Sequence, residues 1–182
     1  MDELNRLLTG PVVEAAPGLL GSRLSWGDQV LTLTEVEAYD GSNDPGSHAY
    51  RGPTTRNQVM FGPPGFLYVY LIYGMHHCAN VTAGPQGKAA GILLRAGVLD
   101  DGTPLSGPGR ICRGLGITRT DNGADLHAHL ELSKSPVDYS SGPRVGLRQA
   151  ADLPWRFWIT GHESVSRYSP AKNRSRPDRR PG

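Results

Sequence analysis

The chain has 182 residues, 37% of them hydrophobic, and a formal net charge of +2, which fits one domain with a sizeable core. Because it contains 24 Gly and 15 Pro, we expect short strands and turns rather than a helical bundle. Its two cysteines, Cys78 and Cys112, are too few for a disulfide framework and favour buried thiols in a reducing compartment. We find no amino-terminal export signal, and no apolar run approaches the roughly 20 residues of a membrane span.

Positive charge is concentrated at the carboxyl end. Residues 170–182 contain five basic side chains and one acidic side chain, a balance of +4, so the other 169 residues carry −2. Such a Pro/Arg/Ser segment cannot bury a core. We therefore expect one domain over residues 1–169 and a basic, disordered tail over 170–182, which either contacts phosphates or only aids solubility. The nearly neutral body argues against a passive nucleic-acid coat protein and leaves room for an enzyme with a local cationic face.

The first predicted element is a short helix over residues 2–8. Apolar and polar residues then alternate over 29–39, which predicts a strand that the glycines and proline of 41–46 end. Residues 54–58 indicate a helix that starts with a Thr cap.

The second half of the pattern predicts more strands. Aromatic and β-branched residues at 66–73 and 76–82, on either side of Gly74, predict a β-hairpin. A strand at 89–99 and a helix at 107–116 follow. Short strands are expected at 130–132 and 157–160.

Two glutamates lie two positions apart in the first long strand. Glu35 and Glu37 should therefore project from the same face as Leu31, Leu33 and Tyr39. A carboxylate beside apolar or aromatic neighbours has a raised pKa and can accept a proton from water near neutral pH. Either glutamate could act as a base, and the alternative is a pair of solvated strand residues.

Tyrosines mark the predicted hairpin. Tyr68 and Tyr70 share one face of their strand and could form a stacking surface, although aromatic rings in strands more often pack in a core. Tyr73, beside Gly74, falls where a ring would protrude, which burial alone explains poorly. A protruding ring can replace an extruded base in a duplex.

Other candidate residues are weaker when taken singly. His48 ends a loop broken by Gly and Pro, where a stacking or hydrogen-bonding role is favoured over metal binding. Asn80 and Arg95 lie on strands that could return to the same centre, or could be edge and surface groups. The histidines at 76, 77, 127 and 129 lack a third ligand in register, so we expect no metal. No phosphate loop, dinucleotide fingerprint or Ser or Cys nucleophile pattern is present.

Taken together, the motifs resemble those of the alkyladenine (methylpurine, 3-methyladenine) DNA glycosylases. The resemblance runs in order from about residue 8 to 168. It rests on T-E-V-E-A-Y at 34–39, His48, T-x-R-N at 54–57, Met60-Phe61, P-G-F-L-Y-V-Y-L-I-Y-G-M at 64–75, Cys78-Ala-Asn80, L-L-R-A at 93–96, S-G-P-G-R-I-C at 106–112 and P-R-V-G at 143–146.

The resemblance implies an α+β fold. It predicts a single compact domain with a curved antiparallel β-sheet or open barrel-like roll, flanking helices and a protruding β-hairpin. It implies a monomer that needs no cofactor and acts on double-stranded DNA containing damaged purines, without a membrane partner. We expect a cytoplasmic protein, associated with the nucleoid if it is bacterial.

The resemblance also implies residue roles. Glu37 would activate water for attack on the sugar C1′, and Arg95 would help to position that water. Tyr39 on one side, with His48 and Tyr70 on the other, would hold the flipped base, while Asn80 would penalise the exocyclic amine of guanine. Tyr73 would be the intercalating wedge, and Arg110 and Arg56 would contact the DNA backbone.

The predicted activity is that of a monofunctional glycosylase in base excision repair. It would release 3-methyladenine and 7-methylguanine, with deaminated or etheno purines such as hypoxanthine and ethenoadenine as further candidates, and leave an abasic site. No lysine in the pocket motifs could form a Schiff base for strand cleavage. Two alternatives remain. A hydrolase of free nucleosides would have no use for Tyr73, and a non-catalytic damaged-DNA-binding protein would not need Glu37.

Overall fold

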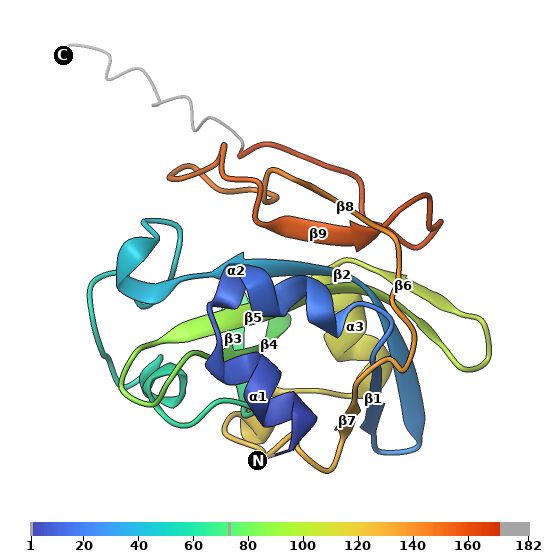
Figure 1. The fold of residues 1–182 in the computed structure, drawn as a ribbon, viewed down its shortest axis with the longest axis horizontal. Helices are drawn as coiled ribbons and strands as arrows, with labels where there is room; N and C mark the ends of the chain where they lie inside the picture. The colour runs from blue at the N-terminus through green and yellow to red at the C-terminus, as the bar shows by residue number, and fades with distance from the viewer. Residues whose placement is uncertain (1, 73, 172–182) are drawn as a thin grey trace, which may run out of the picture.

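The computed structural model describes residues 2–72 and 74–171. They form a curled antiparallel sheet with helices packed on it, which confirms the α+β class (Figure 1). The sheet has the order β3-β4-β5-β2-β1-β7, with β6 paired to β5 and with β9 paired to both β2 and β8. The strands are β1 Arg23–Trp26, β2 Gln29–Tyr39, β3 Leu67–Ile72, β4 His76–Ala83, β5 Ala90–Leu99, β6 Pro104–Ser106, β7 Leu130–Glu131, β8 Tyr139–Gly142 and β9 Arg156–Ile159.

Three α-helices flank this sheet within the described ranges: α1 Glu3–Thr9, α2 Val12–Ala15 and α3 Pro108–Leu115. Asp2 caps α1, because its Oδ1 accepts the Asn5 N–H at 2.7 Å. Pro108 occupies the first turn of α3, and Gly116 ends that helix in the left-handed conformation at φ 71°. Short 3-10 helices occur at Ala16–Leu19, Gly41–Asn43, Gln58–Phe61 and Arg119–Asp121.

Strand β2 is the spine of the fold. It pairs with β5 along most of its length, with β1 beside its first part and β9 beside its second part. Figure 1 shows β8 and β9 as a layer alongside β2, so the last third of the chain returns to the strand that carries the two glutamates.

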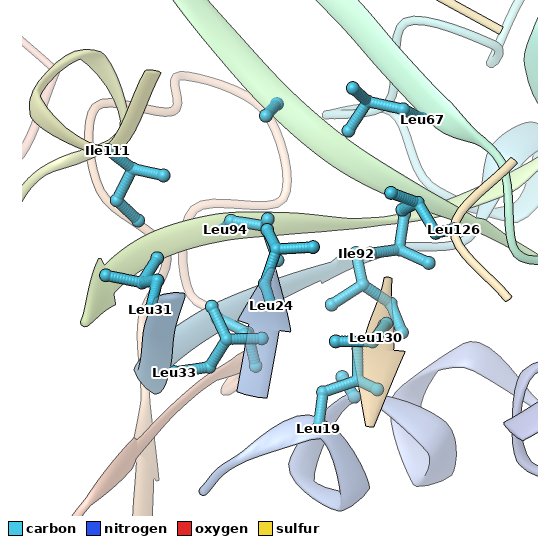
Figure 2. Close-up of a cluster of buried hydrophobic side chains, with 14 of the residues drawn as sticks. Leu19, Leu24, Leu31, Leu33, Leu67, Ile92, Leu94, Ile111, Leu126 and Leu130 are labelled. Atoms are coloured by element: carbon cyan, nitrogen blue, oxygen red, sulfur yellow. The ribbon is translucent and has the colours of Figure 1, made fainter. Parts of the chain in front are cut away.

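The aliphatic core lies against one face of the sheet. Helices α1, α2 and α3 contribute to it together with alternate residues of the long strands. Figure 2 shows part of this cluster, with Leu31 and Leu33 from β2, Ile92 and Leu94 from β5, and Ile111 from α3 among its labelled side chains. Filling one face in this way leaves the opposite face of β2 to β5 available for polar residues.

One predicted orientation is wrong. The two glutamates do not share a face with Leu31 and Leu33, because the β2–β5 register shifts between residues 33 and 36. Before the shift Leu31 and Leu33 enter the core, and after it Val36 and Ala38 do. The irregularity changes the alternation, as a β-bulge does, and it turns Glu35, Glu37 and Tyr39 to the other face.

Most predicted elements are confirmed, including the strand at 29–39, the hairpin, the strand at 89–99 and the helix at 107–116. Both cysteines are buried, as expected. The Thr-capped helix start at 54–58 is wrong, since residues 54–57 form a turn in which Asn57 Oδ1 accepts the Thr54 N–H at 2.6 Å, and only a 3-10 helix without a Thr cap follows at Gln58–Phe61. Strands β1, β6 and β8 and helix α2 were not predicted. Tyr73 and residues 172–182 lie outside the described residues.

Across the parts of the chain that the structure describes, no helix has the length and apolar character needed to cross a bilayer.

Gly97 permits the close approach of β5 to β2 beside the register shift. A Cβ at this position would lie 2.6 Å from the Thr32 carbonyl oxygen and 2.7 Å from Leu31 Cγ. Gly97→Ala should therefore lower the free energy of unfolding by about 1–3 kcal/mol, the usual range for overpacking, as measured by urea denaturation. Gly10→Ala is the matched control, because its Cβ would meet only Leu7 O at 3.3 Å and its φ is an ordinary −69°. Equal stability of both variants would contradict the close-approach argument.

Candidate active site

A row of side chains crosses the sheet on the face opposite the core. Tyr68 of β3 pairs with Asn80 of β4, Asn80 pairs with Leu93 of β5, and Leu93 pairs with Glu37 of β2. Residues directly opposite one another in an antiparallel sheet project from the same face. The register therefore gathers residues from four strands into one patch, although they are far apart in the sequence.

The patch lines a cavity of about 470 Å³, within the range of roughly 300–1,000 Å³ that is typical of small-ligand sites. Seven of the predicted site residues line it: Glu37, Tyr39, His48, Arg56, Tyr70, Asn80 and Arg95. Loop residues 46–48 and 145–147 close its sides.

A second cavity, of about 740 Å³, lies beside the first between the hairpin and α3. The two cavities share Ile72, Cys78 and Pro108. The larger cavity has no carboxylate among its described lining residues, although two histidines, His76 and His77, line it. Arg110 lines this second cavity and not the first.

Glu37 is fully buried at the wall of the first cavity. Its Oε1 accepts the Val145 N–H at 2.7 Å and lies 3.5 Å from Arg95 Nη1, and its Oε2 accepts the Tyr39 hydroxyl at 2.8 Å. Burial raises the pKa of Glu37, and this effect outweighs the lowering by Arg95 and the two hydrogen bonds. The arrangement suits a carboxylate that takes up a proton near neutral pH.

Glu35 has a different environment, although it lies only two residues away. Its oxygens accept the Ser166 N–H at 2.6 Å and the Ser166 hydroxyl at 2.9 Å. They also accept Arg95 Nε and Arg156 Nη1, both at 3.2 Å. Glu35 does not line the cavity. Of the two sequence candidates for a base, geometry therefore favours Glu37.

Arg95 connects the two glutamates. Its Nε donates to Glu35, its Nη2 donates to the Ser166 hydroxyl at 3.1 Å, and its Nη1 faces Glu37. With Glu35 and Ser166 holding one edge of the guanidinium, the Nη1 end is directed to the carboxylate at the cavity wall. Because one edge of the Arg95 guanidinium is held by these hydrogen bonds, its other end is preorganised to contact Glu37 and a ligand in the cavity.

Aromatic rings form the remaining walls. His48 lies over Tyr70 with ring centroids 4.4 Å apart and an interplanar angle of 76°, and its Nδ1 is 3.3 Å from the Tyr68 hydroxyl. Burial raises the pKa values of Tyr39 and Tyr70 well above their usual value. Partial burial, with the nearby positive charge of Arg56, lowers the pKa of His48 although its outer side is exposed. The tyrosine rings are neutral at pH 7, and the lowered pKa of His48 favours its neutral form.

Asn80 is held rigidly in the same wall. Its Nδ2 donates to the Tyr68 carbonyl at 3.0 Å, and its side chain is buried. Arg56 lies exposed at the rim, where its Nη2 donates to the Leu71 carbonyl at 3.0 Å and its Cζ is 5.7 Å from the Tyr70 ring centroid. Tyr73, the predicted wedge, falls outside the described residues.

Some contributors escaped sequence-based prediction. Val145 belongs to the P-R-V-G segment, but its contribution is a main-chain N–H, which no residue type reveals. Ser166 lies in a segment without a recognisable motif, and only the return of the chain beside β2 brings it to Glu35. The described residues contain no group of three or more His, Cys, Asp or Glu side chains arranged to hold a metal ion.

Comparison with known proteins places these features in a family. The sequence profile of Methylpurine-DNA glycosylase (MPG) matches residues 6–163. A protein of Rhodococcus jostii (strain RHA1), described as "Putative 3-methyladenine DNA glycosylase", is 45% identical over 190 residues, with 91% of this chain and 85% of that protein covered. Proteins with the same description from Mycolicibacterium paratuberculosis and Mycobacterium tuberculosis (strain H37Rv) are each 44% identical, covering 92% and 86% of this chain and 93% and 89% of their own length.

The profile spans most of the chain and includes every described residue of the first cavity. The matched range, residues 6–163, contains both glutamates, the hairpin and strands β8 and β9. The chain belongs to the methylpurine-DNA glycosylase family, whose members are DNA-repair enzymes that hydrolyse the N-glycosidic bond between a base and its deoxyribose.

Proposed function

We propose that the chain releases alkylated purines, and some deaminated or etheno purines, from double-stranded DNA with water activated by Glu37. The observation that carries this proposal is a fully buried carboxylate with a raised pKa at the wall of a cavity lined by neutral aromatic rings. The substrates would include 3-methyladenine and 7-methylguanine, with hypoxanthine and ethenoadenine as further candidates. The names of the relatives support the first of these.

The bond-breaking step needs few groups. Glu37 accepts a proton from water as the water oxygen forms a bond to C1′, and the C1′–N bond breaks with its electron pair going to the base. A purine methylated at N3 or N7 is positively charged, so it leaves as a neutral molecule without first being protonated. A neutral purine such as hypoxanthine leaves as an anion unless it takes up a proton, which water would supply. Removing one proton with an oriented carboxylate is ordinary general-base catalysis.

The cavity walls suit a base that has been rotated out of the duplex. In this proposal Tyr39 stacks on one side of the base, and His48 and Tyr70 lie on the other. A cationic ring is attracted to the faces of neutral aromatic side chains. Asn80, fixed by its bond to the Tyr68 carbonyl, would penalise the exocyclic amine of guanine, a cost that 7-methylguanine offsets because its positive charge weakens the glycosidic bond. Arg56 at the rim and Arg110 on α3 would contact phosphates.

Glu37→Gln tests the base directly. Single-turnover release from duplexes carrying 7-methylguanine or hypoxanthine should fall by at least roughly two orders of magnitude, the usual contribution of a general base, while lesion affinity measured by fluorescence anisotropy is retained. Wild type should leave an abasic site without a nick. Tight binding with no release by wild type would favour the damaged-DNA-binding alternative, and normal release by the variant would move the base role to another residue.

The pH dependence follows from the same carboxylate. Catalysis requires ionised Glu37, so single-turnover release by wild type should fall as the pH decreases through the pKa of Glu37, which burial places above the ordinary value of 4.5. The free energy of unfolding should depend on pH in the opposite direction. Because its pKa is raised in the folded state, protonated Glu37 stabilises the fold relative to the unfolded chain, and this contribution is lost as the pH rises through the folded-state pKa. The residual release rate of Glu37→Gln should not show this decrease at low pH. An unchanged decrease in the variant would mean that another group titrates.

Tyr73 can be tested although it lies outside the described residues. If Tyr73 fills the gap left by the extruded base, Tyr73→Ala should weaken binding to a lesion duplex far more than binding to the same lesion in a single strand, where no stack must be held open. Anisotropy titrations of both substrates measure the difference. Equal losses would contradict the wedge role and would revive a nucleoside hydrolase as the alternative.

A further inference from the structure

A buried ion pair lies behind Tyr39. Arg144 and Asp44 are both fully buried, and they form two parallel hydrogen bonds, Nη1 to Oδ2 at 2.5 Å and Nη2 to Oδ1 at 2.8 Å. Such a bidentate pair fixes geometry as well as charge. Neither residue lines the cavity, and no role was predicted for either from the sequence.

The pair connects three walls of the site. Arg144 Nη1 also donates to the Ala38 carbonyl of β2 at 2.8 Å, and the next residue, Val145, donates its N–H to Glu37. Asp44 Oδ1 accepts the Gly46 N–H at 2.9 Å, in the loop that leads to His48. A Cβ on Gly46 would lie 3.0 Å from Arg144 Nη2, so the loop is closely packed on the pair.

The pair also determines the charge behind a stacking ring. Arg144 Cζ lies 4.6 Å from the centroid of the Tyr39 ring. Tyr39 lines the cavity and Arg144 does not, so the ring separates the guanidinium from the cavity. A base stacked on the other face of Tyr39 would lie on the order of 8 Å from the guanidinium, where an unscreened pair of like charges in a protein interior changes an equilibrium by about tenfold or more.

We propose that Asp44 is a specificity-determining residue that neutralises Arg144, so that the guanidinium can hold Tyr39 in place without repelling a positively charged base. The inference rests on the proposed function, because it requires that alkylated purines enter the cavity. Asp44 and Arg144 are positioning residues in this account, since neither reaches the cavity. Their effect on selectivity comes from the charge that remains behind Tyr39.

The test compares a cationic lesion with a neutral one. Single-turnover release is measured from two duplexes that differ only in the lesion, 7-methylguanine or hypoxanthine, and the readout is the ratio of the two rates. Asp44→Asn leaves a positive charge behind Tyr39 and should lower the ratio about tenfold. Arg144→Gln leaves a negative charge and should raise the ratio. The double variant Asp44→Asn/Arg144→Gln leaves no charge and should return the ratio toward that of wild type.

A purely structural role would give a different pattern. Loosening of the walls lowers both rates together and leaves their ratio unchanged, so an unmoved ratio in the single variants would overturn the proposal. Leu24→Ala is the control for lost stability, because Leu24 belongs to the core cluster (Figure 2) and does not line the cavity. It should lower the melting temperature without moving the ratio. Removing one partner of a buried pair is destabilising, so one of the single variants can fail to fold. The two variants are expected to shift the ratio of release rates in opposite directions, so the direction measured for either folded variant tests the proposal. Wild type that releases neither base would refute the proposed function itself.

Discussion

The burial of charge on one face of the sheet is the constraint on which the rest of the site depends. Glu35 and Glu37 are fully buried, and Arg95 and Arg156 are nearly so. Charges removed from water are tolerated only when partners replace the lost hydration. Strands β2 and β5 bring in the glutamates and Arg95, and the chain beyond β8 supplies Arg156 and the Ser166 donors. The layer that β8 and β9 form beside β2 in Figure 1 is therefore part of the site.

The same constraint makes two identical side chains unequal. Glu35 is surrounded by two arginines, a hydroxyl and a main-chain N–H, all bound at 2.6–3.2 Å. Glu37 has one main-chain N–H, a phenol and a more distant arginine at 3.5 Å. Fewer compensating donors leave desolvation dominant, so the pKa of Glu37 is raised. Glu35 can then hold Arg95 in position through its hydrogen bonds, while Glu37 at the cavity wall can accept a proton.

Sequence patterns predicted the elements better than they predicted their faces. Residues 29–39 and 66–82 alternate so regularly that the strand and the hairpin follow from local preference, and Tyr68 and Tyr70 do share a face. The register shift between residues 33 and 36 has no such local signal, because it depends on how β5 pairs with β2. For the same reason Ser166, the Val145 N–H and the Arg144–Asp44 pair could not be foreseen. Each depends on contacts across more than 90 residues of chain.

Paired charges also determine what a ligand in the cavity would experience. The tyrosines are neutral at pH 7 and burial raises their pKa values further, the lowered pKa of His48 favours its neutral form, and Asp44 neutralises Arg144. Glu37 is the one carboxylate among the described residues of the cavity wall, and its arginine, Arg95, lies 3.5 Å away and is shared with Glu35. A cationic purine that enters such a cavity meets polarisable neutral rings and one partly compensated carboxylate, which favours its positive charge. In the proposed reaction the bond to C1′ would break as that charge disappears, so the attraction for the base would weaken at release and the cavity would not retain the neutral product.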